Sequence, residues 1–306
     1  MAPPRCADAV RHGVTRRQIL GSLALASVGP GAGAQGVASQ AVASGLASKL
    51  EKRQFTIAVA NKAALPYLPL TIAERLGYFQ AEGLELTLLE TPSLVRAQHM
   101  AHSGEADAVC GWLENILTAP GKAQPFQAFV LQGRAPQMAF GVSMKTLPGL
   151  RSLASLRGKK VGITAPNTPS HTVAHAVLVR AGLRWSEMGF VSVGTPSGAL
   201  AALRAGQIDA LCYGDPLMTQ LEQGAELRVL ADTRSLSGTQ QVHGGDMPST
   251  CLYTPLDVVQ KYPAMLQAAT DAMVHALKWL QTAGLSDLMK TVPESYFAGD
   301  RALYLA

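Results

Sequence analysis

Short apolar segments alternate with longer amphipathic segments along most of the chain. Residues 55–60 (FTIAVA), 84–89 (LELTLL) and 105–110 read as strands, and a polar loop or a helical pattern follows each of them. The same alternation starts again near residue 147 and continues to residue 231. This pattern favours an α/β architecture with mostly parallel sheets.

Residues 159–183 show the pattern most clearly. A strand at Val161–Ile163 leads into a polar loop, residues 164–170, and a helix that begins beside Pro169. A helix start has unpaired N–H groups and partial positive charge, so this loop could hold an anion or a polar ligand. The same residues also fit an ordinary capped connection between a strand and a helix.

The segments on either side of this unit differ in polarity. Residues 147–163 are predicted to form a surface helix that leads into the strand. Residues 232–248 are polar and contain glycine, so they are predicted to cross back to the first half of the fold. A strand at 249–253 and a helical region at 256–282 follow.

The first 34 residues have the composition of a targeting segment. Residues 15–20 (TRRQIL) resemble the twin-arginine export motif, an apolar stretch follows to about Val28, and Ala32-Gly33-Ala34 has the form of a cleavage site. We therefore expect a signal peptide cleaved near Ala34 and a periplasmic protein. Residues 35–54 are small and polar and are expected to form a flexible linker.

The overall charge does not indicate a nucleic-acid partner. The chain of 306 residues has a formal charge of +5, but the targeting segment holds four arginines against one aspartate, and without it the charge is +2. No basic run interleaved with aromatic residues remains. After that segment, no apolar stretch is long enough to span a membrane.

The cysteines give no disulfide framework. Cys6 lies in the targeting segment, and Cys110, Cys212 and Cys251 are far apart and odd in number. One disulfide is compatible with this spacing, whereas core packing accounts for each cysteine separately.

Two pentapeptides repeat about a hundred residues apart, GEADA at Gly104–Ala108 and GQIDA at Gly206–Ala210. Together with GYF and EGL at residues 77–84 and LRGKKVG at residues 156–162, they give a chain that resembles the periplasmic solute-binding components of ABC transporters for nitrate, sulfonate and taurine. That group also includes binders of thiamine pyrimidine precursors. The resemblance extends over roughly residues 55–300.

The resemblance implies a two-lobed periplasmic binding protein fold of the type II-like class, with a hinge and a cleft between the lobes. Lobe 1 would be discontinuous, residues 55–146 and 236–306, and lobe 2 would comprise residues 147–235. It also implies a monomer that delivers a small polar organic compound or anion to an ABC permease and ATPase. No cofactor, metal or enzymatic activity is expected.

By the same resemblance, ligand contacts are expected in the loops after the strands of each lobe. Arg134 could clamp a sulfonate or carboxylate, or be an ordinary surface arginine. Glu114 and Asp215 instead suit an amine or a ring N–H, so the charge of the ligand stays open. The predicted ligand-binding residues are Asn61, Ser93, Trp112, Glu114, Asn115, Arg134, Asn167, Thr168, Ser170, His171, Thr195 and Asp215.

Other chemistries have weaker support. His171 and His175 have the i, i+4 spacing of metal ligands, but the H-E-x-x-H motif and a third ligand are absent. Residues 194–198 (GTPSG) are not the G-x-S-x-G turn of serine hydrolases. The cysteine-rich CCCFC motif of thiamine-pyrimidine synthases is also missing, so such an enzyme is the weaker alternative. A binding protein that delivers its ligand to a membrane receptor would use the same cleft and stays an alternative.

Overall fold

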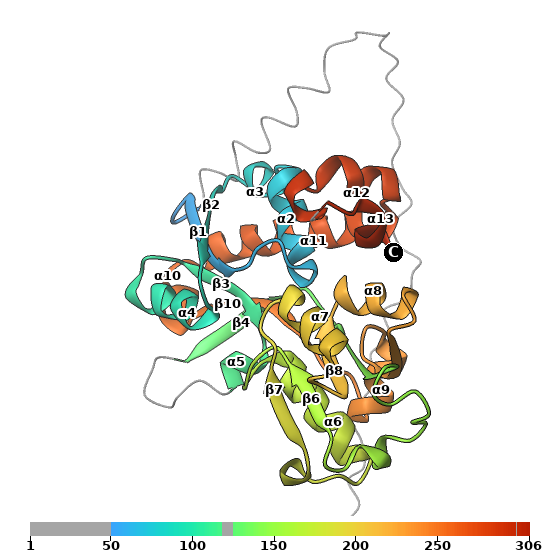
Figure 1. Cartoon of the computed structure of the whole chain (residues 1–306). Coiled ribbons are helices and arrows are strands. Elements are labelled where there is room, and N and C mark those ends of the chain that lie inside the picture. Colours follow the sequence, from blue (N-terminus) through green and yellow to red (C-terminus); the bar gives the residue numbers. More distant parts are fainter. Residues whose placement is uncertain (1–49, 118–124, 298) are drawn as a thin grey trace, which may run out of the picture. The chain divides into compact units, whose positions relative to one another are not determined.

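Two five-stranded sheets organise the part of the chain that this computed structural model describes, residues 50–117, 125–297 and 299–306 (Figure 1). All of these residues fall within one unit of the chain, residues 41–306. The first sheet has the order β2-β1-β3-β10-β4, with bounds Glu85–Thr91, Gln54–Ala60, Ala108–Trp112, Thr250–Pro255 and Phe126–Leu131. The second has the order β7-β6-β8-β5-β9, with bounds Gly189–Ser192, Lys160–Ile163, Ala210–Gly214, Met138–Ser143 and Leu227–Asp232.

The two sheets share one pattern of strand directions. In the first, β1 is parallel to β2 and β3, and β10 is antiparallel to β3 and β4. In the second, β6 is parallel to β7 and β8, and β5 is antiparallel to β8 and β9. Four strands of each sheet therefore point the same way and the fourth in order is reversed, which confirms the α/β prediction with one antiparallel strand in each sheet.

Helices cover both faces of each sheet. In β1, Phe55, Ile57 and Val59 pack with α2 (Leu68–Arg75), α3 (Tyr78–Ala81) and α11 (Pro263–Thr282), while Ala58 packs with α4 (Leu94–Ser103) on the other face. This alternation is the two-residue period of a strand. In the second sheet, α6 (Pro169–Arg180) and α9 (Leu236–His243) contribute to one core, and α7 (Pro196–Ala205) and α8 (Leu217–Gln223) to the other. The described residues also form α5 (Glu114–Leu117), α10 (Leu256–Lys261), α12 (Leu285–Thr291) and α13 (Arg301–Leu305).

The repeated pentapeptides have the same structural role in both halves. Gly104 and Gly206 end α4 and α7 in the left-handed conformation, with φ of 79° and 76°. The following aspartates then attach to β1 and β6, which hold the same position, second in order, in the two sheets: Asp107 accepts from Thr56 N at 2.9 Å, and Asp209 accepts from Lys160 N at 3.0 Å. The repeat is therefore a device that joins the end of a helix to a neighbouring strand.

The chain passes between the sheets twice. Residues 132–137 connect β4 to β5, and residues 233–249 connect β9 to β10. The two connections touch, because Ser249 N donates to Gly133 O at 2.8 Å. A Cβ on Gly133 would lie 2.3 Å from Ser249 Oγ, so the close approach requires glycine there.

Several details differ from the sequence-based expectations. Residues 147–159 form turns, irregular segments and the short 3₁₀ helix η2 (Leu153–Leu156) instead of a surface helix, and β6 follows directly. The polar crossing contains α9. The chain enters the second sheet with β5, ahead of the predicted boundary at residue 147, because β5 pairs with β8 and β9. The lobe boundaries themselves stay a prediction.

The front of the chain is described only from residue 50. The predicted signal peptide and residues 35–49 of the predicted linker lie outside the described residues. The last linker residues contact the fold: Leu50 packs on the first core, and Glu51 accepts from Ala264 N and Met265 N, both at 3.1 Å, at the start of α11. No helix in the described ranges is long and apolar enough to cross a membrane.

Candidate functional site

A cavity of about 780 Å³ lies among the loops that follow strands of both sheets. Its walls include Asn61 after β1, Trp112 at the end of β3, Thr164 after β6 and Asp215 after β8. Ligand sites in open α/β sheets are found at such carboxyl ends of strands. We call this the large cavity.

On the side of the first sheet, the wall is mostly apolar. The loop after β1 turns at Asn61, whose φ is 55°, and leads into the 3₁₀ helix η1 (Leu65–Tyr67). Leu65 and Pro66 of η1 line the cavity. Behind it, Tyr67 lies 6.4 Å from Trp112 between ring centroids, and burial raises the pKa of its phenol well above the ordinary value. Trp112 therefore has a rigid aromatic support at the edge of the cavity.

The end of the chain also contributes to this cavity. Tyr296 and Phe297 of the 3₁₀ helix η4 (Glu294–Phe297), and Asp300, Leu303 and Tyr304 at α13, line it. Asp300 caps α13, because its Oδ1 accepts from Leu303 N at 2.9 Å. None of these residues is among the predicted ligand-binding residues.

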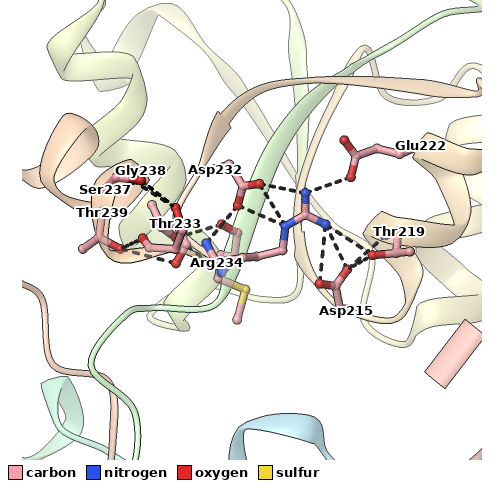
Figure 2. A network of polar contacts seen from close by, with 11 residues as sticks. Asp215, Thr219, Glu222, Asp232, Thr233, Arg234, Ser237, Gly238 and Thr239 are labelled. Carbon is pink, nitrogen blue, oxygen red and sulfur yellow. Dashed lines mark hydrogen bonds and ion pairs between the residues drawn. The ribbon is translucent and has the colours of Figure 1, made fainter. Parts of the chain in front are cut away.

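On the side of the second sheet, one cation sits among three carboxylates (Figure 2). Arg234 Nε donates to both oxygens of Asp232, at 3.0 and 3.1 Å. Its Nη1 donates to Asp215 Oδ1 and to Thr219 Oγ1, both at 3.3 Å. Its Nη2 donates to Glu222 Oε2 and to Asp232 Oδ2, both at 2.8 Å. We call Asp215, Glu222 and Asp232, with Arg234, the carboxylate cluster.

Contacts within the carboxylate cluster shift the pKa values of Arg234 and Asp232. Hydrogen bonds to Asp232 are the main reason that the pKa of Arg234 lies above its ordinary value. Burial by itself would raise the pKa of Asp232, but the hydrogen bonds from Arg234 outweigh burial and hold that pKa below the ordinary range. Three carboxylates and one guanidinium have a formal charge of −2 at neutral pH.

The loop before α6, which had been a candidate anion seat, is occupied by its own hydrogen bonds. Ser170 is buried, and its Oγ accepts from Thr164 N at 2.9 Å. Thr168 Oγ1 donates to Ala165 O at 2.7 Å, and His171 Nδ1 accepts from Asn167 N at 3.0 Å. Thr164 is the residue of this loop that lines the large cavity.

The two histidines of α6 pack against an aromatic neighbour. The rings of His171 and His175 lie 4.4 and 5.2 Å from Trp185 between centroids, and Trp185 stacks on Phe190 at 3.9 Å. Among the described residues, no group of three or more His, Cys, Asp or Glu side chains could hold a metal ion.

A second, small cavity of about 10 Å³ has room for about one water molecule. Trp112, Glu114 and Ser249 line it from the first half, and Pro169 and Thr172 line it from α6. Burial raises the pKa of Glu114, opposed by its hydrogen bond with Thr172. Glu114 therefore joins the loop after β3 to α6.

The structure divides the predicted site residues into those that line a cavity and those that do not. Asn61, Trp112 and Asp215 line the large cavity, and Glu114 lines the small one with Trp112. The residues that line neither cavity are Ser93, Asn115, Arg134, Asn167, Thr168, Ser170, His171 and Thr195. Two of these are helix caps: Ser93 accepts from Arg96 N at α4, and Thr195 accepts from Gly198 N at α7.

Among the described residues that line the large cavity, the cationic one is Arg234. Arg134, for which the sequence left an anion clamp or an ordinary surface arginine open, is exposed and lines neither cavity. The sequence contained one signal for Arg234: Asp232-Thr233-Arg234 begins at the carboxyl end of β9, the same kind of position that selected Asp215 after β8. The prediction that the cysteines pack in the core is confirmed, since Cys110, Cys212 and Cys251 are free and buried.

Comparison with known proteins gives one family and many structural neighbours. A family model described as NMT1/THI5 like matches residues 66–282. A solved structure from Bordetella bronchiseptica RB50 is 43% identical with a TM-score of 0.73, over 84% of this chain and 81% of that one. No curated protein matches the chain.

Two neighbours are named for their ligands. The periplasmic aliphatic sulphonate binding protein SsuA from Escherichia coli is 18% identical with a TM-score of 0.64, over 83% of this chain and 79% of that one. The periplasmic nitrate-binding protein NrtA from Synechocystis PCC 6803 is 15% identical with a TM-score of 0.66, over 83% and 69%. At these identities the likeness is one of fold.

Proposed function

The chain belongs to the NMT1/THI5-like family, and on that basis we propose that it is the solute-binding component of an ABC importer. It has the two-lobed α/β fold of periplasmic binding proteins. In this role it captures a small organic compound in the large cavity and carries it through the periplasm to a permease. The predicted export signal, residues 1–34, supports that location.

The observation that carries the proposal is the composition of the large cavity. Residues from the loop after β1 and the end of β3 line one space together with residues from the loops after β6 and β8. A ligand there contacts loops of both sheets, and in the described part of the chain the sheets are connected by residues 132–137 and 233–249. Bending at these two connections would close both walls on the ligand, which is the hinge closure of binding proteins.

The side chains of the large cavity are suited to hold a polar ligand. In the described part of the chain, no His, Cys or Lys lines it, and its ionisable side chains are Asp215, Asp300, Arg234 and three tyrosines. Carboxylates and hydroxyl groups placed in a largely apolar wall can fix a ligand by hydrogen bonds, which supports a binding role. The buried cysteines are unreactive for the same physical reason that they pack well: burial raises the pKa of Cys110 and of Cys251 to about 12.

A ligand screen by thermal shift tests the proposed function. The purified protein would be heated with sulfonates, nitrate, pyrimidines and organic amines, and each hit would be confirmed by titration calorimetry. A ligand at a hundred times its Kd stabilises the folded protein by about 2.7 kcal/mol, which raises the melting temperature by about 5–10 °C. One-to-one binding without turnover supports the proposal. Turnover of a compound, or no binding by any class, contradicts it.

A further inference from the structure

We infer that the large cavity selects an organic cation, a protonated or quaternary amine on an apolar or aromatic body, and excludes sulfonate and nitrate. This inference rests on the proposed function, because it names the class of solute that the binding protein takes. It follows from how the charged groups around the cavity are already paired.

The guanidinium of Arg234 in the cavity wall is not available to an anion. Arg234 has five N–H groups, and its three nitrogens donate to Asp215, Thr219, Glu222 and Asp232. Clamping a sulfonate in bidentate fashion needs two free N–H groups on adjacent nitrogens. A bound anion would have to displace carboxylates of the same lobe and would then face them.

The helix starts at the cavity are partly occupied as well. α7 and α8 begin beside Pro196 and Pro216, which have no N–H. One further N–H group at each start is capped from within, since Gly198 N donates to Thr195 Oγ1 at 3.3 Å and Thr219 N donates to Asp215 Oδ1 at 3.0 Å. The chain's own residues therefore reduce the number of backbone N–H groups that an anion could use there.

The charge that remains around the cavity is negative. The carboxylate cluster has a formal charge of −2, and Asp300 adds a carboxylate on the opposite wall. Nearby cations are themselves paired: Lys62 Nζ lies 3.8 Å from Glu74, and Arg301 binds Glu294. Among the described residues that line the large cavity, Arg234 is the single cationic side chain.

Asp215 offers a ligand an acceptor that is not saturated. Its Oδ1 accepts from Thr219 N, Thr219 Oγ1 and Arg234, whereas its Oδ2 has one long contact of 3.4 Å to Arg234 Nη1. The side chain is 28% exposed and lines the cavity. Oδ2 can thus accept a hydrogen bond from an ammonium N–H at ordinary length.

The rest of the wall suits the body of such a ligand. Trp112, Tyr213, Tyr296 and Tyr304 line the cavity with aromatic rings, and Leu65 and Leu200 add aliphatic surface. Aromatic faces attract cations through the ring quadrupole, and apolar surface favours a carbon body over a small hydrated anion such as nitrate. Charge and surface therefore favour the same class of ligand.

A panel of matched pairs tests the inference. The probes are primary amines, trimethylammonium compounds and sulfonates on the same ethyl, hexyl and phenylethyl bodies, together with sodium nitrate, each titrated calorimetrically into the full protein. We expect one or more of the cations to bind at least 100-fold more tightly than the sulfonate of the same body. A sulfonate or nitrate that binds best overturns the inference and leaves the proposed function intact. If no probe of this panel binds, the inference is overturned, and the proposed function falls only if its wider screen also finds no ligand.

Three single variants locate the contact. Asp215→Asn keeps an oxygen that can accept from Thr219 N, and it should lower the affinity for the cation at least tenfold. Asp300→Asn keeps the cap of α13, since asparagine is an equally good cap, and should lower the affinity for the cation about threefold. Asp271→Asn on α11 removes one carboxylate outside the cavity, where its partner is Gln267, and should leave the affinity unchanged. Unchanged affinity in both cavity variants would overturn the inference, as would equal losses in all three.

Discussion

Arg234 gives the sharpest test of how the second half of the site is built. It pairs with three carboxylates that would otherwise repel one another. Replacing it by glutamine, written Arg234→Gln, removes the charge and keeps a polar side chain of moderate length. The free energy of unfolding should fall, because the folded state alone brings the three carboxylates together.

The exposed fractions of Arg234 and its three partners set the expected loss in the free energy of unfolding. Removing one partner of a fully buried ion pair costs about 3–5 kcal/mol, and exposed pairs contribute about 0–1 kcal/mol. Arg234 is 22% exposed and its partners are 28%, 35% and 40% exposed, so the cluster lies between these limits. We expect a loss of about 2 kcal/mol at pH 7, which lowers the melting temperature by about 4–8 °C.

The lowered pKa of Asp232 predicts how the stability loss in Arg234→Gln changes with pH. The folded pKa of Asp232 is held below its ordinary value, so its stabilising contribution is present above the unfolded pKa, near 3.9, and is lost as the pH falls through the folded value. Without Arg234 that contribution is missing at all pH values. The difference in stability between the wild type and Arg234→Gln should therefore be largest at pH 7 and shrink below about pH 4.

Urea unfolding at pH 7, 5 and 3 measures both features. Arg204→Gln is the matched control, since Arg204 makes two short hydrogen bonds of 2.7 Å to Glu226 but is exposed and holds a single carboxylate. The urea midpoint of Arg204→Gln should differ from that of the wild type by less than a third as much. Equal urea midpoints for the wild type and Arg234→Gln at pH 7, or a difference that widens at pH 3, would refute the reasoning.

Two further predictions concern the scaffold around the site. Gly238→Ala should lower the free energy of unfolding by about 2 kcal/mol or more, because the new Cβ would lie 1.7 Å from Asp232 O. Gly245→Ala is the control: its Cβ would have nothing within 4 Å, so the free energy of unfolding should change by less than about 0.5 kcal/mol. Urea unfolding measures both. Asp107→Ala should cost about 2–3 kcal/mol, since it leaves Thr56 N without its side-chain acceptor, and hydrogen exchange at the Thr56 amide should then be faster than in the wild type. A wild-type exchange rate at that amide would argue against a role for Asp107 in joining the strands.

The scaffold was largely predictable because its signals are local. Apolar strands such as β1 can be recognised from a few adjacent residues. The glycine of each repeated pentapeptide ends a helix, and its aspartate accepts from a backbone N–H of a neighbouring strand, which are local roles that any α/β unit requires. The 3₁₀ helix at Leu153–Leu156 shows the limit of this reasoning. An amphipathic pattern of moderate length there predicted a helix, but residues 147–159 mostly form turns, and only Leu156 of η2 is fully buried in the core.

The site was harder to predict because polar residues after strands have two uses. Ser93 and Thr195 follow strands, as ligand contacts do, yet their hydroxyl groups cap the next helix. Both roles place the same residue types at the same positions, so sequence alone cannot separate them. Arg134 and Arg234 present a similar problem, since each lies in a segment that connects the two sheets, and the three-dimensional course of that segment decides which guanidinium reaches the cavity.

The two halves of the molecule share a scaffold but contribute different chemistry to the cavity. Strand order, strand directions and the aspartate attachment are the same in both sheets. The loops are not: the first half contributes Trp112 and an apolar turn, and the second contributes the carboxylate cluster. Because the sheets fix where the loops lie, loop residues can change the charge of the cavity without disturbing either core. A fold shared with sulfonate and nitrate binders can therefore hold a cavity whose own charges favour a cation.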